Sequence, residues 1–176
     1  MRKAVTDDAA LQQFLAEDSS VLMESREDVS TFLKLLDSIP NLMIEGAVSF
    51  SLEYIPEKGY MDVWYYMGAD KANSRRYCFT YVLDEDRAQE KRQSILQENA
   101  ECIEKGQIIN GDRTMSVLTK VANKADTELV KRVSYWLDVD GWLVKVSYNH
   151  NQEITSALTL EQVFAPMYVE ETFQWK

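Results

Sequence analysis

The stretch "WLDVDGWLVK", residues 136–145, decides the fold. Apolar and polar residues alternate on both sides of Asp140-Gly141, a pair that tolerates the positive φ angles of a two-residue hairpin turn. A turn at this point produces four cross-strand pairs on one apolar face: Val139–Trp142, Leu137–Val144, Tyr135–Val146 and Val133–Tyr148. The stretch therefore predicts an antiparallel hairpin with one buried face and a fixed register.

The same stretch contains Asp138-x-Asp140-Gly141, which is also how the middle of an EF-hand calcium loop reads. Such a loop needs an oxygen ligand at its first position and a bidentate Glu at its twelfth. If Gly141 is the sixth position, these are Trp136 and Ser147, and neither fits. The flanking segments also favour strands over helices. The sequence predicts a turn here and no metal site.

The alternation with a period of two extends away from this hairpin in both directions. Three successive segments, 48–54, 60–67 and 75–83, alternate in the same way, and short turn-rich links join them. They predict an antiparallel meander. A second β section runs from 107 to 148, in which Asn110-Gly111 predicts another tight turn, and the tail 167–175 is compatible with an edge strand.

Apolar spacings of three and four residues predict helices before and between these strands. Two amphipathic helices are expected in the first 40 residues, the second of them ending at Pro40. A long helix is expected over about 86–105, capped by Asp84 or Asp86; its thin apolar stripe favours a position on the outside of the sheet. Near the end, Thr159 and Gln162 form a capping-box pattern that predicts a short final helix.

These elements predict one α+β domain over residues 1–176, with a helical N-terminal segment (1–40) and a region of sheet plus helices (41–176). The expected architecture is a mostly antiparallel sheet of about six or seven strands with the long helix and the N-terminal helices packed on it, in the order α-α-β-β-β-α-β-β-β-α. From the second helix onward this order resembles that of the small acidic chaperones of type III secretion, apart from one extra strand. The resemblance implies a dimer that binds unfolded segments of a partner; it concerns element order and rests on no sequence motif.

Composition and charge exclude several classes of function. The formal net charge of −10 repels phosphate backbones, and no basic segment offsets it, so we expect no nucleic-acid binding. No apolar run reaches the roughly 18 residues of a membrane helix, and the N-terminus lacks the apolar stretch of a signal peptide. We expect a soluble cytoplasmic protein without membrane contact, or an exported one if a signal has been removed.

Residues suited to catalysis or metal binding are few. The single histidine, His150, has no local partners with ligand spacing, and Cys78 and Cys102 match no metal or redox motif. The two cysteines are expected to be free thiols in the cytoplasm, or a disulfide after export. We therefore predict no catalytic residue, no cofactor and no metal, although a site built from carboxylates remote in sequence stays open as a third interpretation.

The second face of the predicted strands carries aromatic residues where a solvated face would be polar. The residues on it that suit a protein interface are Trp64, Tyr66, Arg76, Trp136 and Lys145. They predict a non-catalytic protein-binding module of chaperone, adaptor or immunity type, binding another protein or itself, with a homodimer as one form. Two alternatives stay open: helices or the tail cover this face, or the sheet and long helix enclose a cavity for a small molecule or lipid.

Overall fold

The computed structural model describes residues 21–23, 26–36, 39–55, 58–98, 106–110, 113–120, 130–154, 160–169 and 173–175. The strands are β1 (Val21–Met23), β2 (Met43–Ile44), β3 (Ser49–Ile55), β4 (Tyr60–Tyr66), β5 (Arg76–Val82), β6 (Gly106–Asn110), β7 (Arg113–Lys120), β8 (Val130–Val139), β9 (Trp142–Ile154), β10 (Met167–Tyr168) and β11 (Phe173–Trp175). The helices are α2 (Arg26–Leu35), α3 (Glu85–Glu98) and α4 (Leu160–Phe164).

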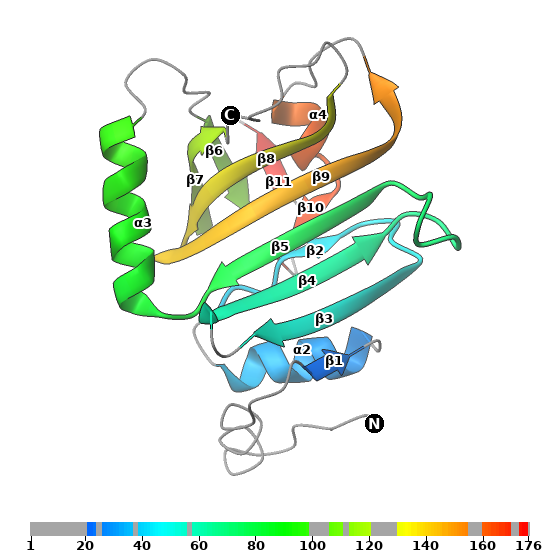
Figure 1. Cartoon of the computed structure of the whole chain (residues 1–176), viewed down its shortest axis with the longest axis horizontal. Coiled ribbons are helices and arrows are strands. Elements are labelled where there is room, and N and C mark those ends of the chain that lie inside the picture. The colour runs from blue at the N-terminus through cyan, green and yellow to red at the C-terminus, as the bar shows by residue number, and fades with distance from the viewer. Residues whose placement is uncertain are drawn as a thin grey trace.

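The described part of the chain has an α+β fold built on antiparallel pairing, as the sequence predicts. One sheet has the order β1-β3-β4-β5-β9-β8-β7-β6-β11, and β10 pairs with β2 apart from it (Figure 1). The seven longer strands, β3 to β9, correspond to the predicted two β sections. The tail contributes an edge strand, because β11 pairs with β6.

The predicted long helix over 86–105 is wrong in its length. The structure describes α3 from Glu85 to Glu98, with Asp84 as its cap: the backbone N–H of Arg87 donates to Asp84 Oδ1 at 2.9 Å. Among the side chains described on α3, only Ala88 and Ile95 are buried. Because a helix in a protein is stabilised mainly by packing of its apolar face, so thin a contact supports a short helix. The predicted first helix and the capping residue Thr159 lie outside the described residues.

The hairpin at the centre of the sequence argument has the predicted register. Val139 pairs with Trp142, and the pairing continues outward through the three further apolar pairs. Asp140 and Gly141 have φ angles of 51° and 84°, which are the left-handed values that this turn requires. Asp138 Oδ1 accepts a hydrogen bond from the Gly141 backbone N–H at 3.1 Å, so this carboxylate supports the turn.

The tight hairpin predicted at Asn110-Gly111 is confirmed, because β6 and β7 pair antiparallel up to Asn110 and Arg113. The first predicted strand, 48–54, begins one residue later than expected, because β3 starts at Ser49 and Val48 is 63% exposed.

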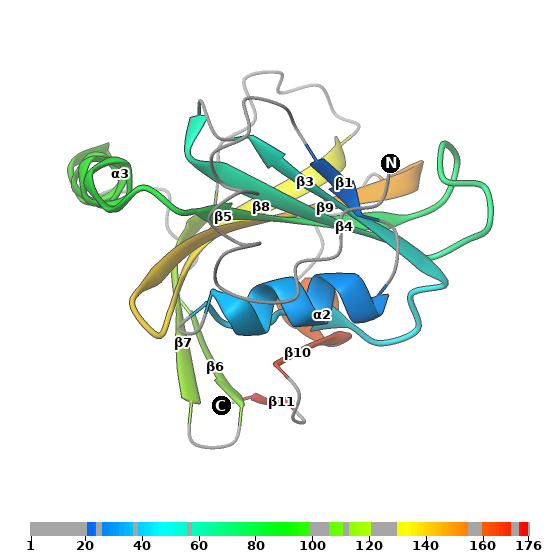
Figure 2. The ribbon, with the colours of Figure 1, turned by 90° about the horizontal axis from the view of Figure 1, so that it is seen from below.

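One face of the sheet, called the inner face below, carries almost all of the core. Its buried side chains alternate along five neighbouring strands: Leu52, Tyr54, Met61, Val63, Tyr65, Tyr77, Phe79, Tyr81, Tyr135, Leu137, Val144 and Val146. Helix α2 covers this face with Phe32 and Leu33, both almost completely buried, and β2, β10 and α4 lie on the same side (Figure 2). The inner face is thus closed by segments from both ends of the described chain.

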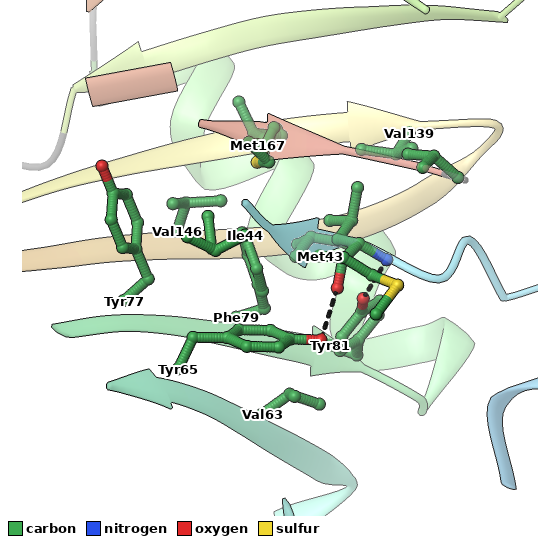
Figure 3. Close-up of a cluster of buried hydrophobic side chains, with 14 of the residues drawn as sticks. Met43, Ile44, Val63, Tyr65, Tyr77, Phe79, Tyr81, Val139, Val146 and Met167 are labelled. Atoms are coloured by element: carbon green, nitrogen blue, oxygen red, sulfur yellow. Dashed lines mark hydrogen bonds between the residues drawn. The ribbon is translucent and has the colours of Figure 1, made fainter. Parts of the chain in front are cut away.

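Tyrosine hydroxyls attach these covering segments to the sheet. The Leu42 backbone N–H donates to Tyr81 Oη at 3.1 Å, and Tyr65 Oη donates to the Leu42 carbonyl at 3.0 Å (Figure 3). Tyr77 Oη donates to the Val163 carbonyl in α4 at 2.8 Å. Burial raises the pKa of Tyr81 well above its usual value, so the hydroxyl stays protonated. These bonds satisfy backbone groups that would otherwise be buried without partners.

Candidate functional site

The opposite face of the same strands, called the outer face below, is built differently. Cross-strand pairing aligns its side chains in rows that run across β3, β4, β5, β9 and β8. The middle row is Ser51, Trp64, Cys78, Ser147 and Ser134; the row on one side is Glu53, Asp62, Thr80, Lys145 and Trp136; the row on the other is Ser49, Tyr66, Arg76, Asn149 and Arg132. The outer face therefore combines small polar, aromatic and charged side chains.

Helix α3 covers one end of the outer face, where β5 ends and β9 begins (Figure 1). Ala88 and Ile95 of α3 form a second buried cluster with three residues of the sheet: Val82, Trp136 and Leu143. Arg92 of α3 forms an ion pair with Asp138, with Nη2 3.0 Å from Oδ2. This end of the outer face belongs to the packing of α3.

Trp136 is consequently separated from the other predicted interface residues. It is only 9% exposed, and the ammonium groups of Lys91 and Lys145 lie 5.5 Å and 6.0 Å from its ring centroid. The apolar alternation identified its face correctly, yet the sequence gave no indication of which end of that face the helix would cover. Trp136 supports Lys145 from beneath α3 and is not available as a surface anchor.

The structure brings Trp64, Tyr66 and Arg76 together away from α3. The Arg76 guanidinium carbon lies 5.7 Å from the Trp64 ring centroid, and the Lys71 ammonium lies 5.3 Å from that of Tyr66. Tyr66 Oη and Ser51 Oγ lie 3.4 Å apart. Both aromatic residues are half-buried in the sheet surface. Stacking of a cation on an aromatic ring fixes both side chains in position.

The middle row holds hydroxyl groups that sequence reasoning missed. Ser134 donates to Ser147 at 2.9 Å, and the two are 2% and 3% exposed. The guanidinium of Arg132 donates to both hydroxyls, at 3.3 Å each. The signal was present in the sequence, because Ser134 and Ser147 occupy outer-face positions of the hairpin where the neighbouring residues are large. The Arg132 guanidinium fills the space above these small side chains, which are almost completely buried.

Cys78 lies in the same row and is a free, buried thiol. Burial, and then the negative charge of Asp62, raise its pKa far above the usual range. The thiol is 3.8 Å from Thr80 Oγ1. Since the thiolate is the reactive form, Cys78 in this setting is not suited to nucleophilic chemistry. Cys102 lies outside the described residues.

Charges are unevenly distributed along the row of Glu53, Asp62, Thr80, Lys145 and Trp136. Glu53 lies directly opposite Asp62, an arrangement of like charges that disfavours pairing of the strands. Asp62 Oδ1 is buried and has no hydrogen-bond partner among the described residues. Two strands away, burial and then the positive charge of Arg132 lower the pKa of Lys145. Neither Asp62 nor Lys145 forms an ion pair within the described part of the chain.

A pocket of about 280 Å³ opens between α3 and the sheet. Ala88, Gln89 and Arg92 line it from the helix, and Val82, Leu143 and Trp142 line it from the strands. Its volume is just below the range of roughly 300–1,000 Å³ that accommodates most small-molecule ligands. The pocket and the group around Trp64 are separate features of the outer face.

The remaining sequence predictions concern residues or classes that the structure only partly describes. His150 falls within β9, and its side chain lies outside the described part. Within the described ranges, no three or more His, Cys, Asp or Glu side chains are grouped as a metal ion requires. The helices that the structure describes are all too short or too polar to cross a bilayer.

Comparison with known proteins adds no relative. No family model matches the chain, and neither does any curated protein sequence or any solved structure. The resemblance to type III secretion chaperones in element order therefore receives no support from sequence or structural similarity.

Proposed function

We propose that this protein is a non-catalytic protein-binding module that docks its partner on the outer face of the sheet, around Trp64, Tyr66, Arg76 and Lys145. The observation that carries the proposal is the stacked pair of Trp64 and Arg76, with centres 5.7 Å apart, beside Tyr66 and away from α3. Trp, Tyr and Arg are the residues most enriched among the few that dominate binding energy at protein interfaces.

The support beneath these residues favours binding by a preformed surface. Trp64 and Tyr66 project from β4, which pairs along its full length with β3 and β5. The inner side of the same three strands is filled by core residues, so their backbones are held rigidly. A rigid surface loses little conformational entropy on binding, which increases affinity.

The mixture of charges on the outer face favours a specific partner over general adhesion. Apart from Val48, none of the large apolar residues described is exposed, so the described surface offers no extensive apolar patch. Binding would instead combine partial burial of the two aromatic rings with charge pairing at Arg76 and Lys145. Interfaces of this kind take their specificity from complementary charges.

The proposal is tested by placing a photo-crosslinking amino acid at Tyr66 in the cell that makes the protein. We expect a discrete covalent adduct with a polypeptide, and we expect Trp64→Ala in the same chain to reduce its yield at least about tenfold, the effect of losing one interface anchor. The matched control carries the crosslinker at Glu27, an exposed residue of α2 on the inner side. No adduct at Tyr66, or equal adducts at both positions, argues against the outer face as the docking surface.

The pocket between α3 and the sheet favours a second candidate, a carrier of a small molecule. Arg92, whose guanidinium is already paired with Asp138, lines one side of the pocket and Leu143 supplies an apolar wall, a combination that suits a compact molecule with both polar and apolar parts. Mass spectrometry of the intact protein under native conditions tests it: a small bound mass that Ala88→Trp removes supports the carrier, and its absence from freshly isolated protein counts against it. The third interpretation, an enzyme with scattered carboxylates, gains no specific observation from the described residues.

A further inference from the structure

We propose that Lys91 and Lys145, with Arg132 beside them, form a binding site for a phosphate group of the kind that a small phosphate monoester carries. The site lies at the edge of the contact between α3 and the outer face of β8 and β9. The inference goes beyond the proposed function, because it requires no partner polypeptide and shares only Lys145 with the proposed docking surface.

Trp136 holds the two lysines in place. The ammonium groups of Lys91 and Lys145 lie 5.5 Å and 6.0 Å from the centroid of its ring. Trp136 is itself only 9% exposed and packs with Ile95 of α3 in the second buried cluster, so the ring is fixed. A cation over an indole is attracted by the electron-rich face of the ring. Two lysines from different elements are thereby held against one side chain.

Two separate sequence patterns bring these lysines together. Lys145 lies directly opposite Trp136 in the pairing of β8 with β9, so the two side chains are neighbours on the outer face. Lys91 lies three residues after Ala88 and four before Ile95, the two buried side chains described on α3. Residues with this spacing share one face of a helix, so Lys91 projects on the side of α3 that meets the sheet.

Arg132 adds a third positive charge. It lies four residues before Trp136 on β8, so its side chain projects from the same face of the sheet. Its guanidinium donates to Ser134 and Ser147 at 3.3 Å each, and these serines form the cross-strand pair next to that of Trp136 and Lys145. The charge of Arg132 therefore acts on the site while the guanidinium stays bonded to both serines.

Acidic side chains of the described part do not neutralise these cations. Neither Lys91 nor Lys145 forms an ion pair within that part. Asp138 is paired with Arg92, whose Nη2 lies 3.0 Å from its Oδ2. Asp62 shares a row with Lys145 but projects from β4, two strands away. Positive charge is thus concentrated at this place in a chain whose net charge is −10.

The clustering of like charges affects Lys145 most. Burial, and then the positive charge of Arg132, lower the pKa of Lys145, and Lys91 lowers it further. Cations that repel one another at a half-buried position are stabilised by an anion bound between them, which would raise the pKa of Lys145 back toward its usual value. Such an arrangement is more common at binding sites than elsewhere on a protein.

A phosphate group fits this arrangement better than a carboxylate does. It carries about two negative charges and three acceptor oxygens, so both ammonium groups can donate to it at once. Each ammonium has three N–H donors, and its contact with the indole ring uses no hydrogen-bond acceptor. The partly buried position strengthens each charged contact relative to one in bulk water. A carboxylate has a single charge, which leaves most of the repulsion in place.

Titration of the purified full chain with inorganic phosphate and with methyl phosphate tests the inference. We expect either probe to shift the indole N–H NMR signal of Trp136 in a saturable way and to raise the pKa of Lys145. Sodium chloride at the same ionic strength should produce no saturable shift, and acetate should bind at least about tenfold more weakly. Lys91→Gln and Lys145→Gln should each weaken phosphate binding by about tenfold, the effect of losing one charged hydrogen bond. Lys91→Arg, which keeps the charge, should retain most of it.

Lys71 provides a matched control. Its ammonium also lies over an aromatic ring, 5.3 Å from the centroid of Tyr66, but the side chain is exposed and belongs to no such cluster. Lys71→Gln should therefore leave the affinity for phosphate unchanged.

The outcomes separate this inference from the proposed function. A shift that never saturates, one that sodium chloride reproduces, or an equal loss of affinity in Lys71→Gln overturns the phosphate site; so does acetate that binds as tightly as phosphate. If Lys145→Gln does not fold, Lys91→Gln on the surface of α3 still decides. A Tyr66 crosslink to a polypeptide without phosphate binding overturns this site and leaves the docking surface standing. Phosphate binding without any Tyr66 adduct has the reverse meaning.

Discussion

The two faces of the central strands carry side chains with different roles, although alternate residues of the same strands form both faces. On the inner face of β5 each side chain is a buried tyrosine or phenylalanine, whereas on the outer face the same strand carries Arg76, Cys78, Thr80 and Val82. The inner face is sealed by α2 and α4. The outer face is sealed only where α3 crosses it, within the part of the chain that the structure describes. One strand therefore contributes to a packed core on one side and to the proposed docking surface on the other.

The test of this contrast with the largest expected effect compares two neighbouring residues of β5. Phe79→Ala should lower the free energy of unfolding by about 3–5 kcal/mol, because it leaves a cavity in the filled inner core. Cys78→Ala, on the outer face, should cost about 1 kcal/mol or less, because it removes a single sulfur atom. Denaturant unfolding measures both. Equal losses would show that the outer face is packed as tightly as the inner one.

The next test removes a polar contact from the inner face. Tyr81→Phe deletes the hydroxyl that accepts the Leu42 N–H and should cost about 1–3 kcal/mol, the effect of leaving a buried donor unpaired. Tyr60→Phe, on the outer face and half-buried, is the matched control and should change stability by less than about 0.5 kcal/mol. A small loss at Tyr81 would mean that the segment containing Leu42 is held by apolar packing alone.

A third test concerns the attachment of α3, which gives the outer face its covered end. Gly59 has a φ of 64°, and a Cβ there would lie 2.8 Å from Asp84 Cβ, the residue that caps α3. Gly59→Ala should therefore cost about 1–2 kcal/mol from backbone strain alone, and more if the cap is displaced. Unfolding measurements should be accompanied by hydrogen exchange of α3 amides. Unchanged protection in α3 would separate the turn from the helix.

The smallest test is the dependence of stability on pH, for which the two faces have opposite signs. The pKa of Tyr77 is raised by burial above the ordinary 10.0, so its stabilising effect is complete below pH 10 and is lost as the pH rises further. The pKa of Lys145 is lowered below 10.5 by burial, so its cost is present at neutral pH and disappears as the pH approaches 10.5. Relative to the unchanged chain, Tyr77→Phe should gain stability on the alkaline side and Lys145→Gln should lose it. If the free energies of unfolding of both variants, relative to the unchanged chain, shifted in the same direction as the pH rises, these opposite effects of Tyr77 and Lys145 would be contradicted.

Much of the fold could be predicted because the alternation of apolar and polar residues along a strand shows which face of the sheet each side chain lies on. Tyr135, Leu137, Val144 and Val146 alternate so regularly around Asp140-Gly141 that the register followed from the turn, and the structure reproduces it pair by pair. The length of α3 could not be predicted in this way, because Ala88 and Ile95 alone are buried among its described side chains and local spacing does not say where packing stops.

The candidate site was predictable only in part for the same reason. Alternation placed Trp64, Tyr66, Arg76, Trp136 and Lys145 on one face, and the structure places them there. The alternation contains no information on which element covers that face, so the burial of Trp136 beneath α3 was not foreseen. The predicted hairpin register already implied the pair of Ser134 and Ser147, which was missed, whereas the alignment of this pair with Cys78 exists only once β5 and β9 are paired. Sites assembled across strands emerge from pairing and not from any one segment.

The outermost strands of the large sheet carry a practical consequence for handling this protein. β1 and β11 are three residues each, and they come from opposite ends of the chain, next to the seven residues of β3 and the five of β6. Long unpaired strand edges are templates for aggregation, whereas very short ones offer few free hydrogen-bonding groups. Shortening the polypeptide past Val21 or before Phe173 would uncover a longer edge, so tags and truncations are best confined to the residues outside these two strands.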